Sequence, residues 1–230
     1  MEAGLQRPIP VFGLDAEARA TFITRTYLHL FGAIVAFTLL EAFFFVTGLA
    51  YVMAAAMLGT SWLLVLGGFV LVSWVATRVA HHTESLAAQY AALGAYVLAE
   101  AILFTPLLVI AQLRVPGSIT AAALVTLIGF TGLTAVAFTT RKDFSFLGSL
   151  LRWGGMLAMV LIVSGVIFGF QLGTFFMVAM VAFAGAAILY DTSNVLHHFP
   201  EDRYVGASLE LFASVALLFW YVLRLLSSRD

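Results

Sequence analysis

The fold of this chain is decided by apolar runs of membrane-spanning length, and residues 173–193 are representative: GTFFMVAMVAFAGAAILYDTS. An α-helix of about 20 mostly apolar residues is long enough to cross the hydrocarbon core of a bilayer. This run reaches that length and then ends at a carboxylate, Asp191. A charged group at a membrane edge is costly to keep, so Asp191 is a candidate functional residue.

The composition places the whole chain in a membrane. Of its 230 residues, 63% are hydrophobic and 10% are charged, whereas a soluble domain has about 25% charged residues. The net charge of -1 gives no basic surface for nucleic acid. The absence of cysteine excludes disulfides, thiolate metal sites and cysteine nucleophiles. The lone lysine, Lys142, lies in a polar connection, which excludes a retinal Schiff base within a span.

Seven apolar runs, joined by short polar connections, predict an all-α integral membrane protein with a seven-helix bundle. We expect residues 1–21 to form a polar N-terminal tail and residues 22–230 to form the membrane domain. The predicted spans cover residues 26–47, 56–77, 86–110, 118–138, 147–169, 173–192 and 205–226.

The distribution of basic residues predicts the orientation, because arginine and lysine concentrate on the cytoplasmic side. A cytoplasmic N-terminus puts most of them inside and leaves only Arg114, Arg224 and Arg229 outside. The C-terminus is then external, unless the last span is re-entrant. The predicted cytoplasmic set is Arg7, Arg19, Arg25, Arg78, Arg141, Lys142, Arg152 and Arg203.

Ionisable residues near the cytoplasmic ends of the spans form one predicted group. Asp191 on the sixth span and Arg78 on the second lie at the same depth, and pairing lowers the cost of both charges. Glu210 enters the seventh span from the same side, and Ser214 follows it on the same helix face. The alternatives are a purely structural Asp191–Arg78 pair and a Glu210 that stays in the headgroup layer.

Two further acids, Glu41 and Glu100, are predicted to approach the outer side. Each lies about 16–19 residues past the cytoplasmic boundary, or roughly 24–28 Å along its helix. An acid near each mouth is typical of a cation route, and calcium prefers carboxylate and carbonyl oxygens. Alternatively, Glu41 extends to the outer interface. Glu100 precedes Thr105-Pro106, which is expected to kink its helix.

Enzyme chemistry is not expected. Neither a His-Glu-x-x-His pattern nor a Gly-x-Ser-x-Gly pattern occurs in the sequence. The histidine pairs 81–82 and 197–198 are predicted to lie in solvated loops. We therefore expect no catalytic residues, no tightly bound metal and no cofactor.

Three stretches in a fixed order carry a resemblance to a known family. The first is the connection 138–145, FTTRKDFS, which Leu147-Gly148 continues. The second is 189–193, LYDTS, and the third is the last span, which opens with Tyr204-Val205 and closes with 223–226, LRLL. Together they resemble the transmembrane Bax inhibitor motif family, whose founding member is Bax inhibitor-1, over about residues 20–228.

The resemblance implies a bundle with a central last helix and a pH-sensitive calcium leak. In that family two hydrogen-bonded aspartates on the sixth and seventh helices close the pore, with an arginine of the second helix nearby. Asp191 matches the first aspartate and Arg78 matches the arginine. Ser214 stands where the second aspartate belongs, so it is expected to donate a hydrogen bond to Asp191 while Glu210 supplies the second acid.

The resemblance to bacterial members implies an alternative function. Some of those members also have serine at this position, and they include a modulator of a membrane-anchored AAA protease. In this alternative the chain transports nothing, and its N-terminal tail, residues 1–20, contacts the protease. The expected location is a bacterial inner membrane, with the endoplasmic reticulum as the alternative. Calcium is expected as a permeant ion and not as a cofactor.

Overall fold

The computed structural model describes residues 10–140 and 142–228, and within these ranges the chain forms eight α-helices and two short 3-10 turns. Apart from α2, the α-helices belong to seven segments that are long and apolar enough to cross a membrane, so the prediction of an all-α seven-helix membrane protein is confirmed. The α-helices are α1 Ala16–Val46, α2 Leu49–Leu58, α3 Trp62–His82, α4 Leu86–Arg114, α5 Ser118–Thr140, α6 Leu147–Phe168, α7 Thr174–His197 and α8 Tyr204–Leu226.

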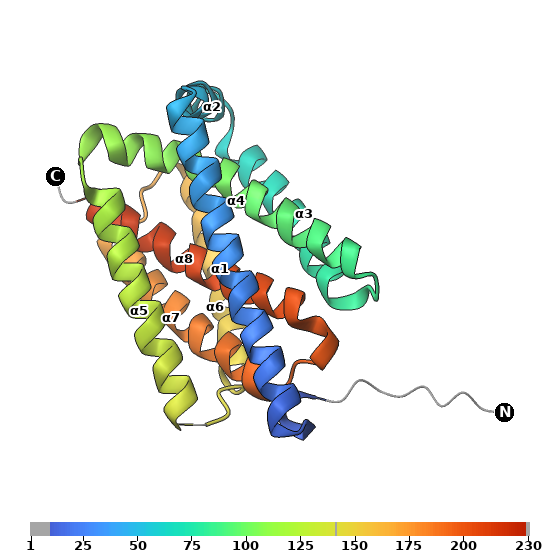
Figure 1. The fold of residues 1–230 in the computed structure, drawn as a ribbon. Helices are drawn as coiled ribbons and strands as arrows, with labels where there is room; N and C mark the ends of the chain where they lie inside the picture. The colour runs from blue at the N-terminus through green and yellow to red at the C-terminus, as the bar shows by residue number, and fades with distance from the viewer. Residues whose placement is uncertain (1–9, 141, 229–230) are drawn as a thin grey trace.

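The last helix lies at the centre of the bundle, as the resemblance implied. It packs against α7, α1, α5, α4 and α3 (Figure 1). Its side chains are buried along the whole helix, from Val205 through Leu211 to Leu223. A helix that is surrounded by other helices and buried along its length forms the core of a bundle.

The outward faces of the surrounding helices are apolar. Leu28 on α1, Trp74 on α3, Ile128 on α5 and Trp153 on α6 are all exposed on the protein surface. Hydrocarbon accommodates such a surface, whereas water does not. The structure therefore agrees with an integral membrane protein.

The first helix starts earlier than its hydropathy suggests. It begins at Ala16, where the Asp15 side chain caps it by accepting the backbone N–H of Ala18 at 2.8 Å. The last residues of the predicted tail are therefore helical, because a capped helix continues through polar residues that lie outside the membrane. Residues 1–9 of that tail lie outside the described residues.

The predicted second span is divided into two helices. The short helix α2 follows α1 at Gly48, whose φ of +76° is a left-handed conformation that glycine adopts at little cost. The spanning helix α3 begins only at Trp62 and continues to His82. Later in the chain, α7 continues to His197. The predictions that His81, His82 and His197 lie in loops are therefore wrong.

The start of the described chain and three interhelical connections meet at one end of the bundle. The backbone N–H of Val11 donates to the Phe199 carbonyl at 2.9 Å, and Pro10 bridges to Pro200. Arg203 donates to the carbonyl of Thr83, which joins the α7–α8 and α3–α4 connections. We call this end the N-terminal face. The end of α8 lies at the opposite end of the bundle (Figure 1).

Candidate functional site

A hydrogen bond between two central helices forms the middle of the candidate site. Ser214 of α8 donates its hydroxyl to the Asp191 carboxylate of α7, and both side chains are buried. Asp191 lies six residues before the end of α7, so it is inside a helix and not at its edge. A buried carboxylate requires a donor, and the hydroxyl supplies one. The expected Ser214–Asp191 contact is therefore present.

Glu210 has its own partner one turn before Ser214. Its carboxylate approaches Nε2 of His81 on α3 at 3.0 Å, with side-chain exposures of 29% and 20%. The two groups form a close charge contact without the alignment of a hydrogen bond. Protonation of His81 makes this contact an ion pair. The sequence indicated Glu210 but not His81, because it placed the histidine in a loop.

A glycine on α8 permits this contact. A Cβ atom on Gly206 would lie 3.1 Å from the carbonyl oxygen of Ala80 and 3.4 Å from the His81 ring. The backbones of α8 and α3 therefore approach closely at this level, one turn before Glu210. Without a side chain at residue 206, His81 can reach across to Glu210.

The expected pair between Arg78 and Asp191 is not formed. Arg78 is exposed, and its guanidinium lies 5.5 Å from the ring centroid of Trp74 on the same helix. Ala76 and Ala80 are buried and mark the inward face of α3. Arg78 is two residues from each of them, which places it on the opposite side of the helix. His81 supplies the basic group of α3 instead.

These groups lie beside a cavity of about 450 Å³ at the N-terminal face, which we call the vestibule. Arg203 and Glu210 both line it. Arg203 is the N-cap of α8, and Glu210 lies seven residues further along, so Glu210 lies roughly 10 Å deeper than Arg203. The Ser214–Asp191 bond lies one turn deeper again. Further lining residues are His81, Ser145, Tyr190, Asn194, His198, Phe199 and Pro200.

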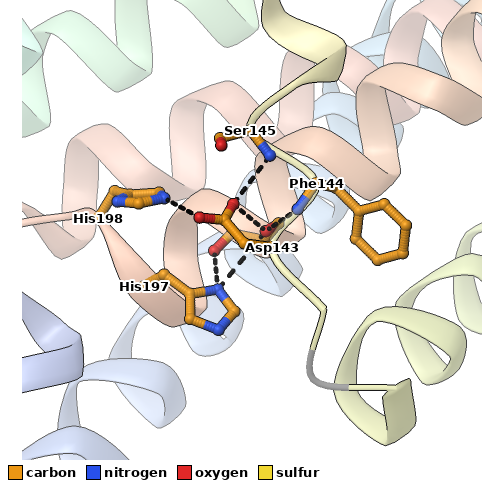
Figure 2. A network of polar contacts seen from close by, with 6 residues as sticks. Asp143, Phe144, Ser145, His197 and His198 are labelled. Carbon is orange, nitrogen blue, oxygen red and sulfur yellow. Dashed lines mark hydrogen bonds and ion pairs between the residues drawn. The ribbon is translucent and has the colours of Figure 1, made fainter.

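A second polar cluster ties the α5–α6 connection to the end of α7 (Figure 2). The Asp143 carboxylate accepts the backbone N–H of Ser145 at 2.8 Å and contacts Nε2 of His198 at 3.1 Å. The Ser193 hydroxyl accepts the backbone N–H of Phe144 at 2.9 Å. The hydrogen bond from the Ser145 backbone, helped by His198, lowers the pKa of Asp143 below its usual value of 3.8. This cluster holds one wall of the vestibule.

A glycine also fixes the position of Tyr190, which lines the vestibule next to Asp191. The Tyr190 ring lies against Gly148 of α6, where an added Cβ would come within 2.8 Å of it. The sequence indicated Leu147-Gly148 and Tyr190-Asp191 as parts of two separate motifs. The structure shows that the two motifs contact each other.

The polar groups continue from Asp191 toward α4. Glu100 is buried there, and Tyr96 stands one turn away on the same face of the helix. The Tyr96 phenol lies within electrostatic reach of the carboxyls of both Glu100 and Asp191. Pro106 lies inside α4, and the Thr105 hydroxyl donates to the Ala101 carbonyl at 2.9 Å. Glu210, Asp191, Tyr96 and Glu100 thus form a discontinuous polar series through the bundle.

Glu41 lies apart from that series. It is 7% exposed, and neither of its carboxyl oxygens has a hydrogen-bond partner. It lines a mostly apolar pocket of about 250 Å³ between α1, α4, α5 and α8. The pocket shares no lining residue with the vestibule. Because Glu41 is buried, the alternative that it extends to the interface is wrong; its place on a cation route stays a prediction.

The described ranges contain no set of side chains that could bind a metal ion. No group of three or more histidine, aspartate or glutamate side chains between residues 10 and 228, Arg141 aside, is arranged to hold a metal ion. The groups that are brought together can exchange protons and hydrogen bonds between helices.

The chain matches the family described as "Inhibitor of apoptosis-promoting Bax1" over residues 19–230. Among similar curated proteins, PA2604 of Pseudomonas aeruginosa is 34% identical over 46% of this chain and 48% of its own length. The Modulator of FtsH protease YccA of Escherichia coli K12 is 33% identical over 42% of this chain and 45% of its own length. In a second strain YccA is named an inner membrane protein. A BI1-like protein of Arabidopsis thaliana is 33% identical over 50% of this chain and 47% of its own length. The chain thus spans about half the length of the curated relatives it matches.

Proposed function

We propose that this chain, which belongs to the Bax inhibitor-1-like family of inhibitors of apoptosis-promoting Bax1, is a pH-sensitive cation leak, most suited to calcium. The observation that carries the proposal is the Ser214–Asp191 hydrogen bond, which joins α7 to α8 directly below the vestibule. In the closed protein this bond holds the two helices together where a cation leaving the vestibule would have to pass.

Protonation of Asp191 weakens this closure. A carboxylate accepts a charge-assisted hydrogen bond, which is about twice as strong as a neutral one. Addition of a proton removes that advantage, so α7 and α8 are held together less tightly. The groups that face this carboxyl are Ser214 and Glu210 on α8 and Tyr96 on α4, and His81 on α3 faces Glu210. The second acid of the switch is therefore Glu210.

The cation route follows the polar series. Calcium takes carboxylate and carbonyl oxygens as ligands, and Glu210, Asp191 and Glu100 supply carboxylates at successive depths. Pro106 lies inside α4 and has no N–H, so the carbonyl of Ile102 lacks its helical donor, which leaves a free oxygen beyond Glu100. Glu41 lies outside this series, in a separate pocket, and its place on a cation route stays a prediction.

The basic residues favour a cytoplasmic vestibule. Arg19, Arg25, Lys142 and Arg203 lie toward the N-terminal face, whereas Arg114 and Arg224 lie toward the other end. Basic residues concentrate on the cytoplasmic side. With a relative named an inner membrane protein, we place the chain in a bacterial inner membrane with its N-terminal face in the cytoplasm.

Calcium flux into dye-loaded liposomes tests this proposal. The wild-type protein is expected to show a flux that changes with pH, and Asp191→Asn is expected to show a flux that pH no longer changes. Ser208→Ala is the matched control, because Ser208 is a buried α8 serine whose hydroxyl donates to Val205 of its own helix. An unaltered pH profile in Asp191→Asn would rule out the gating role.

A second candidate function rests on a different part of the molecule. The relative YccA is named a modulator of the FtsH protease, and residues 10–14 are attached to the α7–α8 connection beside the vestibule. In this proposal a membrane-anchored AAA protease such as FtsH is the partner. Deletion of residues 1–9 is expected to abolish co-purification with the protease and to leave calcium flux unchanged. Loss of flux with retained protease binding contradicts it.

A further inference from the structure

An apolar pocket with a single unpaired acid lies in the half of the bundle opposite the N-terminal face. Phe37 of α1, Leu108 of α4 and Phe219 of α8 contribute to its walls. Glu41 is five residues from the end of α1, so it lies about 8 Å from that end of the helix. The pocket is therefore separate from the vestibule and lies close to the other membrane interface.

Two of the three polar side chains that line this pocket lack hydrogen-bond partners. Both carboxyl oxygens of Glu41 are buried and make no hydrogen bond, and the buried hydroxyl of Thr126 on α5 also makes none. The Thr38 hydroxyl is already used, since it donates to the Ile34 carbonyl at 2.8 Å. Buried polar groups almost always have partners. Two unsatisfied groups in one pocket indicate that a bound molecule satisfies them.

We infer that this pocket binds a lipophilic primary amine that enters from the membrane. A primary ammonium group carries three N–H donors and no acceptor, which matches two carboxylate oxygens and one hydroxyl oxygen. The remaining walls are apolar and suit a hydrocarbon body. At about 30 Å³ for each group the size of a water molecule, the volume of about 250 Å³ holds roughly eight heavy atoms.

Other cations fit the pocket less well. Calcium requires six to eight oxygen ligands, and Glu41 with Thr126 supplies far fewer. A phospholipid amine has a phosphate close to its nitrogen, and the pocket has no cationic side chain to accept that phosphate. The ligand chemistry is therefore an amine that is attached directly to an apolar body.

The pocket has lateral access from the bilayer. It lies between α1 and α5, both of which pack on α8. On these two helices Thr38 and Leu127 line the pocket and are exposed at the surface. An amphiphilic amine at the membrane interface can reach Glu41 between these two side chains.

Photolabelling in phosphatidylcholine nanodiscs tests the inference. The probe is an alkylamine that has a diazirine on its chain and roughly eight heavy atoms outside the diazirine. Mass spectrometry is expected to find the label in residues 34–41 and 119–127. Excess n-heptylamine is expected to prevent labelling, and n-heptanol of the same size is not. Equal competition by the alcohol would overturn the inference, because it would show an apolar cavity that does not select for charge.

Three variants complete the test. Glu41→Gln removes the charge at nearly constant volume and is expected to reduce labelling about tenfold, the effect of losing a charge-assisted hydrogen bond. Ala123→Leu fills the pocket and is expected to reduce labelling as well. Glu100→Gln changes a buried acid outside the pocket and is expected to leave labelling unchanged. Full labelling of Glu41→Gln overturns the inference, whatever the flux measurements show.

Discussion

The two ends of this bundle treat buried acids differently. At the N-terminal face, the buried Asp191 accepts a hydrogen bond from Ser214, and the partly buried Glu210 contacts His81. In the opposite half, Glu41 is equally buried and has no partner. An acid that is paired across helices holds those helices together. An acid without a partner retains its capacity to bind something that is not part of the protein.

The largest expected effect on stability comes from removing the hydrogen-bond donor of a buried acid. Ser214→Ala leaves the Asp191 carboxylate buried without its donor, which costs about 3 kcal/mol of the free energy of unfolding. Denaturant titration in mixed micelles measures this loss. Ser208→Ala, which removes a hydroxyl bonded within its own helix, is expected to cost much less. Equal losses in the two variants would show that the Ser214–Asp191 hydrogen bond stabilises the protein no more than a hydrogen bond within one helix.

A slightly smaller effect is expected where α8 approaches α3. The methyl group of Gly206→Ala would lie 3.1 Å from the Ala80 carbonyl, so the helices must move apart, at a cost of about 1–3 kcal/mol. The thermal midpoint is expected to fall and the His81–Glu210 contact to lengthen. Gly132→Ala is the matched control, since its methyl group would contact nothing within 4 Å. A normal midpoint in Gly206→Ala would contradict the close approach.

Replacement of the unpaired acid is expected to stabilise the protein, whereas the two substitutions above destabilise it. Glu41→Leu removes a buried group that has no partner, and it is expected to raise the free energy of unfolding by about 1 kcal/mol. Glu100→Leu is expected to lower it, because Glu100 has Tyr96 within reach. The two variants are compared in the same titration. A destabilised Glu41→Leu would indicate that Glu41 has a partner in the folded protein.

The smallest expected effect concerns the exposed loop. Because the pKa of Asp143 is lowered below 3.8, its bonds stabilise the α5–α6 connection above about pH 4 and are lost as the pH falls through the lowered pKa. Hydrogen exchange of residues 144–148 is expected to rise only in strong acid. Asp143→Asn is expected to raise it at neutral pH as well, though modestly, since exposed pairs contribute little. Unchanged exchange in Asp143→Asn would show that other contacts hold the loop.

Hydropathy predicted the spans but not where the helices end. The seven apolar runs form helices, because a backbone in hydrocarbon must satisfy its own hydrogen bonds. However, α1 begins at Ala16 and α7 extends to His197, since helical hydrogen bonds continue into water wherever caps and neighbouring segments support them. For the same reason the sequence put Asp191 at a helix edge, although it lies within one.

The candidate site was predicted in part. The Ser214–Asp191 contact followed from matching two motifs to a known family, because spacing along each helix fixes which side chains face inward. Arg78 was expected to pair with Asp191 because both have the right depth. Depth does not determine rotation about the helix axis. The buried positions Ala76 and Ala80 show that Arg78 faces away from the bundle, and the contact with Glu210 shows that His81 faces α8.

The central position of α8 has a consequence for how the protein is made. Ribosomal synthesis delivers the helices in chain order, and α8 follows every other helix of the described chain. The earlier helices therefore enter the bilayer before the element that joins them exists, with Asp191 and Glu100 still lacking their final surroundings. The packing of the other helices around α8 can therefore be completed only after this helix has been made.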